Sequence, residues 1–207
     1  MRTRYLRKES GVTLIELLVA LVICGVAVAA IYRLFIVQTR AYTVQDQIVE
    51  IQQTVRSAMD ILVRDLQMTG YDDDSTPAVT INTPLATPLA NNSITVGYEY
   101  AGQRHSVAYW VDGSQTLFRQ LTINDVAGPQ DILLPNVDVL AFTYGIDPDE
   151  DGDVDSWEVA ADVGSSKVIA ASVTLTARPT AVTPDVPQMV TPRTLTSAVT
   201  FRNLIMK

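Results

Sequence analysis

The 207-residue sequence contains one cysteine, Cys24, and one histidine, His105. A single cysteine excludes an intrachain disulfide, and a zinc site of the Cys/His type would need further ligands that the chain lacks. A serine or cysteine nucleophile activated by histidine would have to use His105, and no nucleophile-elbow pattern accompanies it. These absences argue against an enzyme.

Basic residues are also scarce, and they are unevenly placed. The chain has 15 Lys and Arg against 23 Asp and Glu, and four of the basic residues lie before Gly11: Arg2, Arg4, Arg7 and Lys8. The chain without residues 1–11 has 11 basic and 22 acidic residues. A surface that binds nucleic acid electrostatically needs clustered Lys and Arg, so no direct nucleic-acid binding is expected.

The longest apolar run, residues 17–31, follows this basic leader. With its flanks it is long enough to cross a bilayer, and we expect residues 12–37 to span the membrane once. The leader is expected on the cytoplasmic side, because positive charge stays inside. Glu16 lies where the chain enters the membrane, and a carboxylate at that depth is costly enough to be a candidate functional residue.

No proline follows until Pro77, so the helix is predicted to continue beyond the membrane, from about residue 13 to about residue 69. Gly70 is a plausible C-terminal cap. Between residues 38 and 70 apolar residues recur at steps of three and four, which predicts an amphipathic helix half. This stripe comprises Ala41, Val44, Ile48, Ile51, Val55, Ala58, Leu62 and Leu66. A free-standing coiled-coil stalk is the alternative for this half.

From residue 71 the pattern changes to short alternating or β-branched runs, which predict a β-rich head over residues 71–207. The expected strands are 94–100, 106–111, 116–123, 137–146, 168–176 and 195–201. Gly102 and the Asp112-Gly113 pair mark hairpin turns, so the first three strands should form an antiparallel meander. The fold class predicted from the sequence is therefore α+β, with one long N-terminal helix carrying an antiparallel β-sheet head.

The junction between leader and apolar run resembles the type IV prepilin signal in the stretch Gly11-Val12-Thr13-Leu14-Ile15-Glu16. An ordinary secretory signal is cut after its apolar run, whereas here the small residue precedes it. The resemblance implies that a prepilin peptidase removes residues 1–11, that Val12 becomes the N-methylated first residue, and that Glu16 meets the terminal amine of a neighbouring subunit. The alternative is a signal anchor whose Glu16 reaches the membrane interface.

Two further motifs are similar to minor members of the type IV pilin superfamily. Residues 65–71, Asp-Leu-Gln-Met-Thr-Gly-Tyr, resemble the end of the first helix in PilW-type minor pilins. Residues 200–203, Thr-Phe-Arg-Asn, are similar to the last strand of PilW and of the GspJ minor pseudopilin. Many major pilins have a kinking proline where this chain has Arg33, and they commonly carry a C-terminal disulfide that Cys24 alone cannot form.

The resemblance implies a type IV pilin-like fold and a non-enzymatic minor pilin in a tip or initiation complex of a type IV pilus. The implied partners are prepilin peptidase, other minor pilins and the major pilin through the N-terminal helix, and a tip adhesin. The implied location is the inner membrane and then the pilus at the cell surface. A minor pseudopilin of type II secretion is the alternative, and a membrane-tethered periplasmic calcium-binding protein or enzyme is the third interpretation.

Residues 147–158 reproduce the pattern of a twelve-residue EF-hand calcium loop. Short carboxylates at alternate positions can converge on one ion, glycine at position six permits the turn, and glutamate at position twelve can bind through two oxygens. The predicted calcium ligands are Asp147, Asp149, Asp151, Asp153 (through its backbone carbonyl), Asp155 and Glu158. Strands rather than helices are expected on both sides, and a solvated acidic loop is the alternative.

Overall fold

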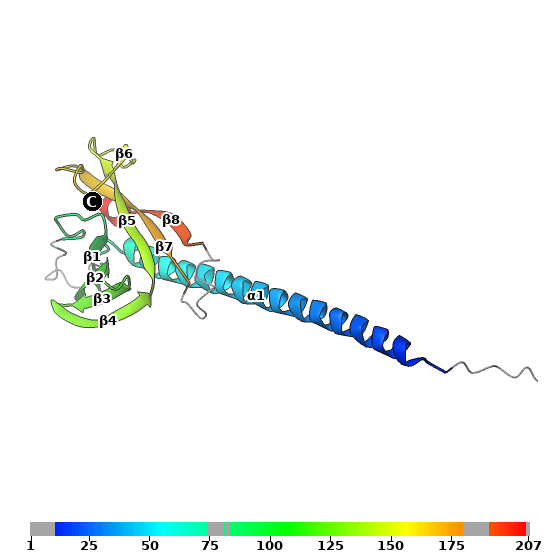
Figure 1. Ribbon diagram of the computed structural model, residues 1–207. Coiled ribbons are helices and arrows are strands. Elements are labelled where there is room, and N and C mark those ends of the chain that lie inside the picture. Colours follow the sequence, from blue (N-terminus) through cyan, green and yellow to red (C-terminus); the bar gives the residue numbers. More distant parts are fainter. Residues whose placement is uncertain (1–10, 74–80, 82, 180–190, 206–207) are drawn as a thin grey trace, which may run out of the picture. The chain divides into compact units, whose positions relative to one another are not determined.

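The computed structural model describes residues 11–73, 81, 83–179 and 191–205 (Figure 1). The predicted leader up to Ser10 lies outside these ranges. The chain divides into two units, one ending at Gln45 and the other beginning at Asp46. Helix α1, Leu14–Gln67, belongs to both, and its bounds confirm the predicted long helix.

In the first unit the apolar side chains of α1 are exposed, among them Leu17, Ile23, Val28 and Phe35. The helix is long and apolar enough to cross a membrane, judged by length and composition. Exposed apolar residues around the whole helix surface are the pattern of a segment surrounded by lipid or by other helices.

In the second unit the predicted stripe of α1 enters the core of the head. Its positions from Ile51 to Leu66 are buried, whereas Ala41 is exposed and Val44 and Ile48 are half-buried. Full burial of the stripe therefore begins at Ile51, about three turns after its start. The helix ends at Gln67. Gly70, three residues further on, has the positive φ of a cap glycine (71°), but its N–H donates to Gly97 O at 2.9 Å rather than to a helix carbonyl.

The first sheet is a four-stranded antiparallel meander in the order β1-β2-β3-β4. It contains β1 Ser93–Tyr100, β2 Gln103–Val111, β3 Leu117–Ile123 and β4 Val126–Leu134. The predicted three-stranded meander is confirmed, with Gly102 in the first hairpin turn at a φ of 70°. Strand β4 was not predicted because it contains Pro129, which a sheet accepts at its edge.

The second sheet is also four-stranded and antiparallel, in the order β6-β5-β7-β8. Its strands are β5 Val137–Asp147, β6 Ser156–Glu158, β7 Lys167–Ala177 and β8 Arg193–Thr200, and the short helix α2, Arg202–Ile205, follows. Strands β5, β7 and β8 were predicted to within two residues at each end. Strand β6 and helix α2 were not.

The α+β class is confirmed, with the head built as two sheets rather than one. Both contribute to a core that includes α1 residues 51–66, with Tyr109 from β2, Phe142 from β5 and Leu175 from β7. The end of the chain closes this core. Asn203 Nδ2 donates to the carbonyl oxygens of Gln67 and Thr69 at 3.4 and 3.2 Å, and a Cβ at Gly70 would lie 2.5 Å from Leu204 Cδ2.

Candidate functional site

The predicted processing and assembly residues lie at the start of α1. Gly11 and Val12 are exposed and precede the first helical residue, Leu14. Thr13 is the N-cap: its Oγ1 accepts a hydrogen bond from Glu16 N at 3.3 Å. Glu16 Oε2 in return accepts from Thr13 N at 2.9 Å and from Thr13 Oγ1 at 3.0 Å.

This reciprocal arrangement is a capping box, with the threonine at the N-cap and the glutamate three residues later. Sequence reasoning assigned Glu16 to a neighbouring amine and overlooked its local partner, although Thr-x-x-Glu is a readable signal. The bonds to Thr13 engage Oε2, so Oε1 is available to a second donor. Within the described chain, Glu16 can thus cap its own helix and still present a carboxylate oxygen to another subunit.

The predicted calcium loop connects β5 with β6, and its first residue, Asp147, is the last residue of β5. Asp147 is fully buried and its carboxylate accepts two backbone hydrogen bonds, from Asp151 N to Oδ1 at 3.1 Å and from Gly152 N to Oδ2 at 3.0 Å. Gly152 has a φ of 92°, which favours glycine and matches the turn expected at position six. Asp151 Oδ1 accepts from Asp153 N at 2.9 Å. The loop is thereby folded around its own first carboxylate.

The structure brings together the carboxylates of Asp147, Asp149 and Asp151, whose oxygens lie within 4.8 Å of one another. Asp155 is exposed, but it is close enough that partial desolvation, together with the charges of these three residues and of Asp153, raises its pKa. Oxygen ligands held close together at negative potential suit a hard divalent cation such as calcium. Among the described residues, Asp147, Asp149 and Asp151, with Asp155 beside them, are the ones that could hold such a cation.

Glu158 is placed differently from the expected twelfth ligand. It lies on β6, where it pairs with Tyr144 of β5, and its Oε1 accepts from Ser156 Oγ at 2.9 Å. It is not among the carboxylates that converge. In an EF-hand a helix follows the loop, whereas here the chain leaves the loop along a strand.

A polar cluster that sequence reasoning missed lies under the first sheet. Asp65 of α1 is buried; its Oδ2 accepts from Tyr109 Oη at 2.6 Å and from Arg119 Nε at 2.7 Å. Burial and the Asp65 carboxylate both raise the pKa of Tyr109. The sequence signal that could have revealed this cluster is Asp65 itself, an acidic residue between Leu62 and Leu66 on the apolar side of the helix. Every member has a partner, so the cluster fits a structural role.

Two other sequence features have local roles. Asp73, in the segment after α1, has an Oδ2 that accepts from Ala101 N at 2.7 Å in the β1–β2 turn. His105 lies on β2 with its ring stacked on Tyr98, the centroids 5.1 Å apart. Burial lowers the pKa of His105.

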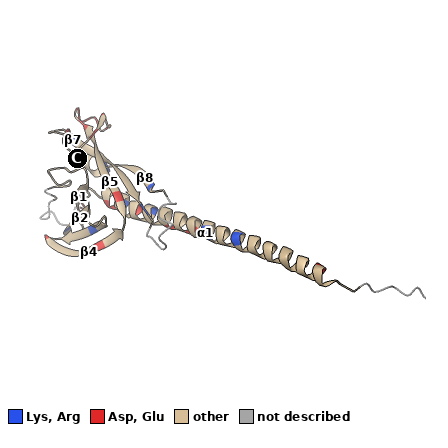
Figure 2. Cartoon of the chain, in the orientation of Figure 1, with Lys and Arg blue, Asp and Glu red and all other residues tan. Residues whose placement is uncertain are grey.

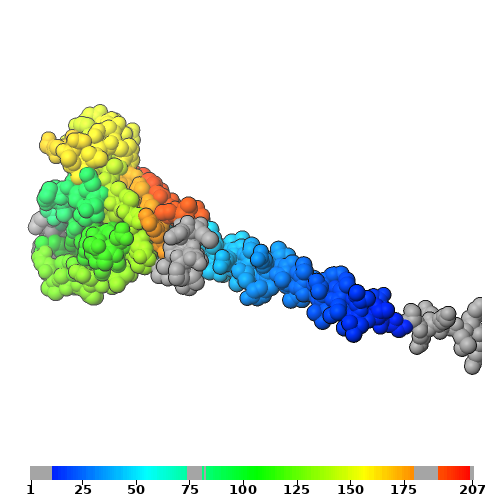
Figure 3. Space-filling view, in the orientation of Figure 1, coloured from blue at the N-terminus to red at the C-terminus, as the bar shows by residue number. Residues whose placement is uncertain are grey.

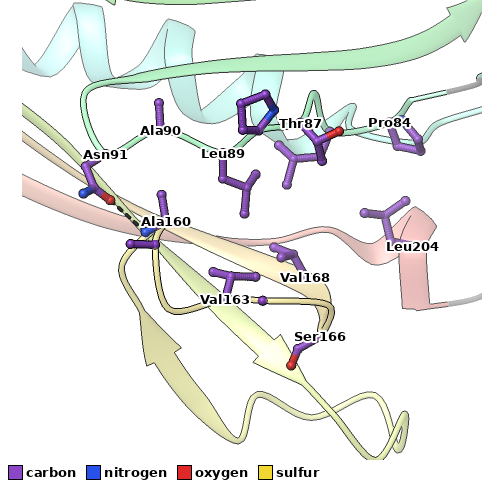
Figure 4. Close-up of a pocket in the computed structure, with 14 residues that line it drawn as sticks. Pro84, Thr87, Leu89, Ala90, Asn91, Ala160, Val163, Ser166, Val168 and Leu204 are labelled. Carbon is purple, nitrogen blue, oxygen red and sulfur yellow. Dashed lines mark hydrogen bonds between the residues drawn. The ribbon is translucent and has the colours of Figure 1, made fainter.

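One groove of the described head has a volume of about 780 Å³ (Figure 4). Its walls are the segments 84–91 and 160–168, tied together by a 2.8 Å hydrogen bond from Ala160 N to Asn91 Oδ1, and Leu204 of α2. The described residues that line it are apolar or neutral polar, with no ionisable side chain. They therefore offer no group for acid–base catalysis.

Comparison with known proteins addresses the N-terminal segment. Residues 6–32 match the model of the prokaryotic N-terminal methylation motif. Among solved structures, a type IV-like pilin from Thermus thermophilus is similar, at 11% sequence identity and a TM-score of 0.48 over 74% of this chain and 97% of that chain. No match was found among curated proteins. The chain therefore carries the N-terminal methylation motif of prokaryotic pilin-type proteins.

Proposed function

We propose that the protein is a minor pilin, a structural and non-enzymatic subunit of a tip or initiation complex of a type IV pilus. The observation that carries the proposal is the methylation motif at residues 6–32, whose last residues form the start of a helix able to span a membrane. A folded head of two antiparallel sheets follows the helix. This order of parts suits a subunit that packs by its helix and displays its head.

In this function the chain is held in the inner membrane with its N-terminus in the cytoplasm and its head in the periplasm. A prepilin peptidase removes residues 1–11 and Val12 is methylated. Exposed apolar side chains along α1 then pack against the helices of other minor pilins and of the major pilin. A tip adhesin is a further partner for the head.

Residues 200–203 resemble the last strand of GspJ as well as that of PilW, so the second candidate is a minor pseudopilin of type II secretion. One deletion experiment separates the two. Loss of the gene is expected to abolish surface pili and leave secretion through the outer membrane intact. Lost secretion with normal pili would assign the chain to the secretion system, and no effect on either would contradict both.

We further propose that the loop at 147–158 binds calcium outside the cytoplasm. The converging oxygens of Asp147, Asp149 and Asp151, with Asp155 beside them, support this proposal. The seven carboxylates of residues 147–158 repel each other, and a divalent cation would relieve that repulsion. The ion would hold the β5–β6 connection in one conformation.

A further inference from the structure

Strand β8 forms one edge of the second sheet and pairs only with β7 among the described strands. Phe201 N donates to Ile169 O at 2.7 Å, and the register pairs Ala170 with Thr200. Hydrogen-bonded and non-hydrogen-bonded pairs alternate along an antiparallel ladder. The backbone N–H and C=O groups that point away from β7 are therefore those of Thr194, Thr196, Ala198 and Thr200.

The other three sheet edges carry features that prevent further pairing. Strand β1 is covered by a short segment, with Ala86 N donating to Thr95 O and Gly97 N donating to Pro84 O. Strand β4 contains Pro129 and pairs with β3 through two register shifts, and β6 has three residues. Strand β8 has eight residues in unbroken register, without proline or lysine. Natural sheets rarely leave such an edge unprotected unless a partner uses it.

Two grooves follow this edge of β8, one at each end. The first, of about 540 Å³, lies between residues 49–56 of α1 and residues 193–195 of β8. The second, of about 380 Å³, is lined by Gln67 of α1, residues 198–200 of β8 and Arg202. Neighbouring side chains on a strand point to opposite faces, so a groove lined by three consecutive residues runs along the strand edge. Figures 1 and 3 show β8 beside α1.

Both grooves are basic, although the chain as a whole has a formal charge of −8. Arg56 and Arg193 line the first and Arg202 lines the second. None of the three forms an ion pair with a described residue, whereas Arg104, Arg119 and Arg178 elsewhere in the head each pair with an aspartate. Arg193 Nε is buried and has no hydrogen-bond partner in the described chain. Strand β8 itself carries no acidic residue (Figure 2).

We propose that an extended acidic segment of a neighbouring subunit adds to the free edge of β8 as a fifth strand of the second sheet. Its backbone pairs with the four outward-facing residues, and its carboxylates meet Arg56, Arg193 and Arg202. Main-chain hydrogen bonds supply the affinity in this mode of recognition, and the side-chain pairs supply the specificity. That the segment belongs to a neighbouring subunit rests on the proposed pilin function; the acidic, extended character of the segment does not.

The test uses the full-length protein in detergent micelles and a fluorescent eight-residue peptide of alternating Glu and Val, followed by fluorescence anisotropy. The Glu/Val peptide is expected to bind and a Lys/Val peptide of the same length is not. Replacing Arg56, Arg193 and Arg202 together by Gln should weaken binding by about tenfold or more, because three charge pairs are lost. The matched control is Arg64→Gln, an exposed arginine of α1 outside both grooves, and it should leave affinity unchanged.

Ala198→Pro tests the strand edge itself. Residue 198 directs its N–H away from β7, so proline there removes an edge donor and spares the ladder with β7. Peptide binding should be lost in this variant, with thermal stability close to the parent protein. In the parent protein, bound peptide should slow hydrogen exchange at residues 194, 196, 198 and 200.

Several results would overturn the proposal. These are equal binding of the basic peptide, equal losses in Arg64→Gln and in the triple variant, or slowed exchange elsewhere than in β8. Self-association of the protein that Ala198→Pro abolishes, without peptide binding, would assign the edge to a second copy instead. Leader removal and pilus formation do not enter these measurements, so failure here is distinguishable from failure of the proposed function.

Discussion

The hydroxyl group of Tyr109 donates a 2.6 Å hydrogen bond to the buried carboxylate of Asp65, joining the first sheet to helix α1. Arg119 Nε binds the same carboxylate oxygen at 2.7 Å. The two residues of the hydrogen bond are 44 positions apart in sequence, and the bond forms only when the sheet has packed on the helix. It therefore reports on docking of the head and makes a direct stability prediction.

Asp65→Asn should lower the free energy of unfolding by about 3 kcal/mol, because Arg119 would lose its buried counter-charge. Tyr109→Phe should cost about 1–2 kcal/mol, since the ion pair would persist. Denaturant unfolding of the full-length protein, followed by circular dichroism, measures both. Asp125→Asn, in an exposed pair with Arg104, is the control and should cost less than about 1 kcal/mol. Equal effects of the three variants would contradict a structural role for the cluster.

The mature protein is expected to begin at N-methylated Val12. Mass spectrometry of the native N-terminus measures this. Gly11 is exposed in the structure, as a cleavage site must be. Replacing Gly11 by a bulky residue should leave the leader attached. An unprocessed Met1 in cells that contain the peptidase, or a start beyond Ile31, would contradict the prediction.

Glu16 should act in assembly through its negative charge, and in helix capping through a side-chain oxygen that accepts hydrogen bonds from Thr13. Glu16→Gln keeps a residue able to complete the capping box but removes the carboxylate, so pilus incorporation should fall sharply at equal expression. Thr13→Ala removes the N-cap and keeps the charge, at a cost of about 1 kcal/mol in helix stability, and incorporation should be largely kept. Quantifying the protein in sheared pili measures both. Normal incorporation of Glu16→Gln would limit Glu16 to the capping role.

Calcium should stabilise the head, because a ligand that binds only the folded state adds about 2.7 kcal/mol at a hundredfold excess over Kd. Asp149→Asn is the cleanest test, since Asp149 belongs to the cluster and accepts none of the hydrogen bonds that shape the loop. Thermal unfolding of the full chain with calcium or chelator should show the shift in the parent and in Asp162→Asn, and lose it in Asp149→Asn. Glu158→Gln should have a small effect. If calorimetric titration with calcium detects no binding in the millimolar range, residues 147–158 form only an acidic turn.

The pH dependence of the calcium-free protein follows from Asp155, whose pKa is raised above the ordinary value of 3.8. A carboxyl group with a raised pKa holds its proton more tightly in the folded chain, so its contribution to stability is present below 3.8 and is lost as the pH rises through the raised value. Asp155→Asn should therefore stabilise the calcium-free protein at neutral pH and have no such effect in strong acid. Thermal unfolding in chelator at the two pH values measures this. A destabilised variant at neutral pH would show that Asp155 has a favourable partner.

The parts of the fold that follow from periodic patterns were predictable. Helix α1 was predicted because its apolar stripe and lack of proline extend without interruption, and the meander because glycine turns separate alternating runs. Strand β4 was missed because Pro129 suggests a loop, and only its place at a sheet edge makes that proline compatible with pairing. Helix α2 has four residues, too few for any period to appear.

For the candidate sites, too, local sequence patterns could be read and long-range contacts could not. Local motifs were enough to single out Gly11, Val12 and Glu16 as candidates, and their roles stay predictions. The closeness of Asp147, Asp149 and Asp151 could be foreseen because they are near neighbours in sequence. Glu158 was assigned to the ion by the EF-hand pattern, whereas pairing with β5 takes it into a strand. The partners of Asp65 could not be found from the sequence, because Tyr109 and Arg119 reach it only through the packing of sheet on helix.

Under the proposed pilin function, the contacts of Asn203 and Leu204 with the end of α1 have a consequence for export. A membrane-anchored chain is translocated from its anchor outward, so residues 203 and 204 emerge after both sheets. Until they arrive, the carbonyl groups of Gln67 and Thr69 lack the Asn203 amide and Gly70 lacks its apolar cover. In that function the head would stay open at this end during translocation, and truncated chains would be exposed to periplasmic proteases before they could join an assembly.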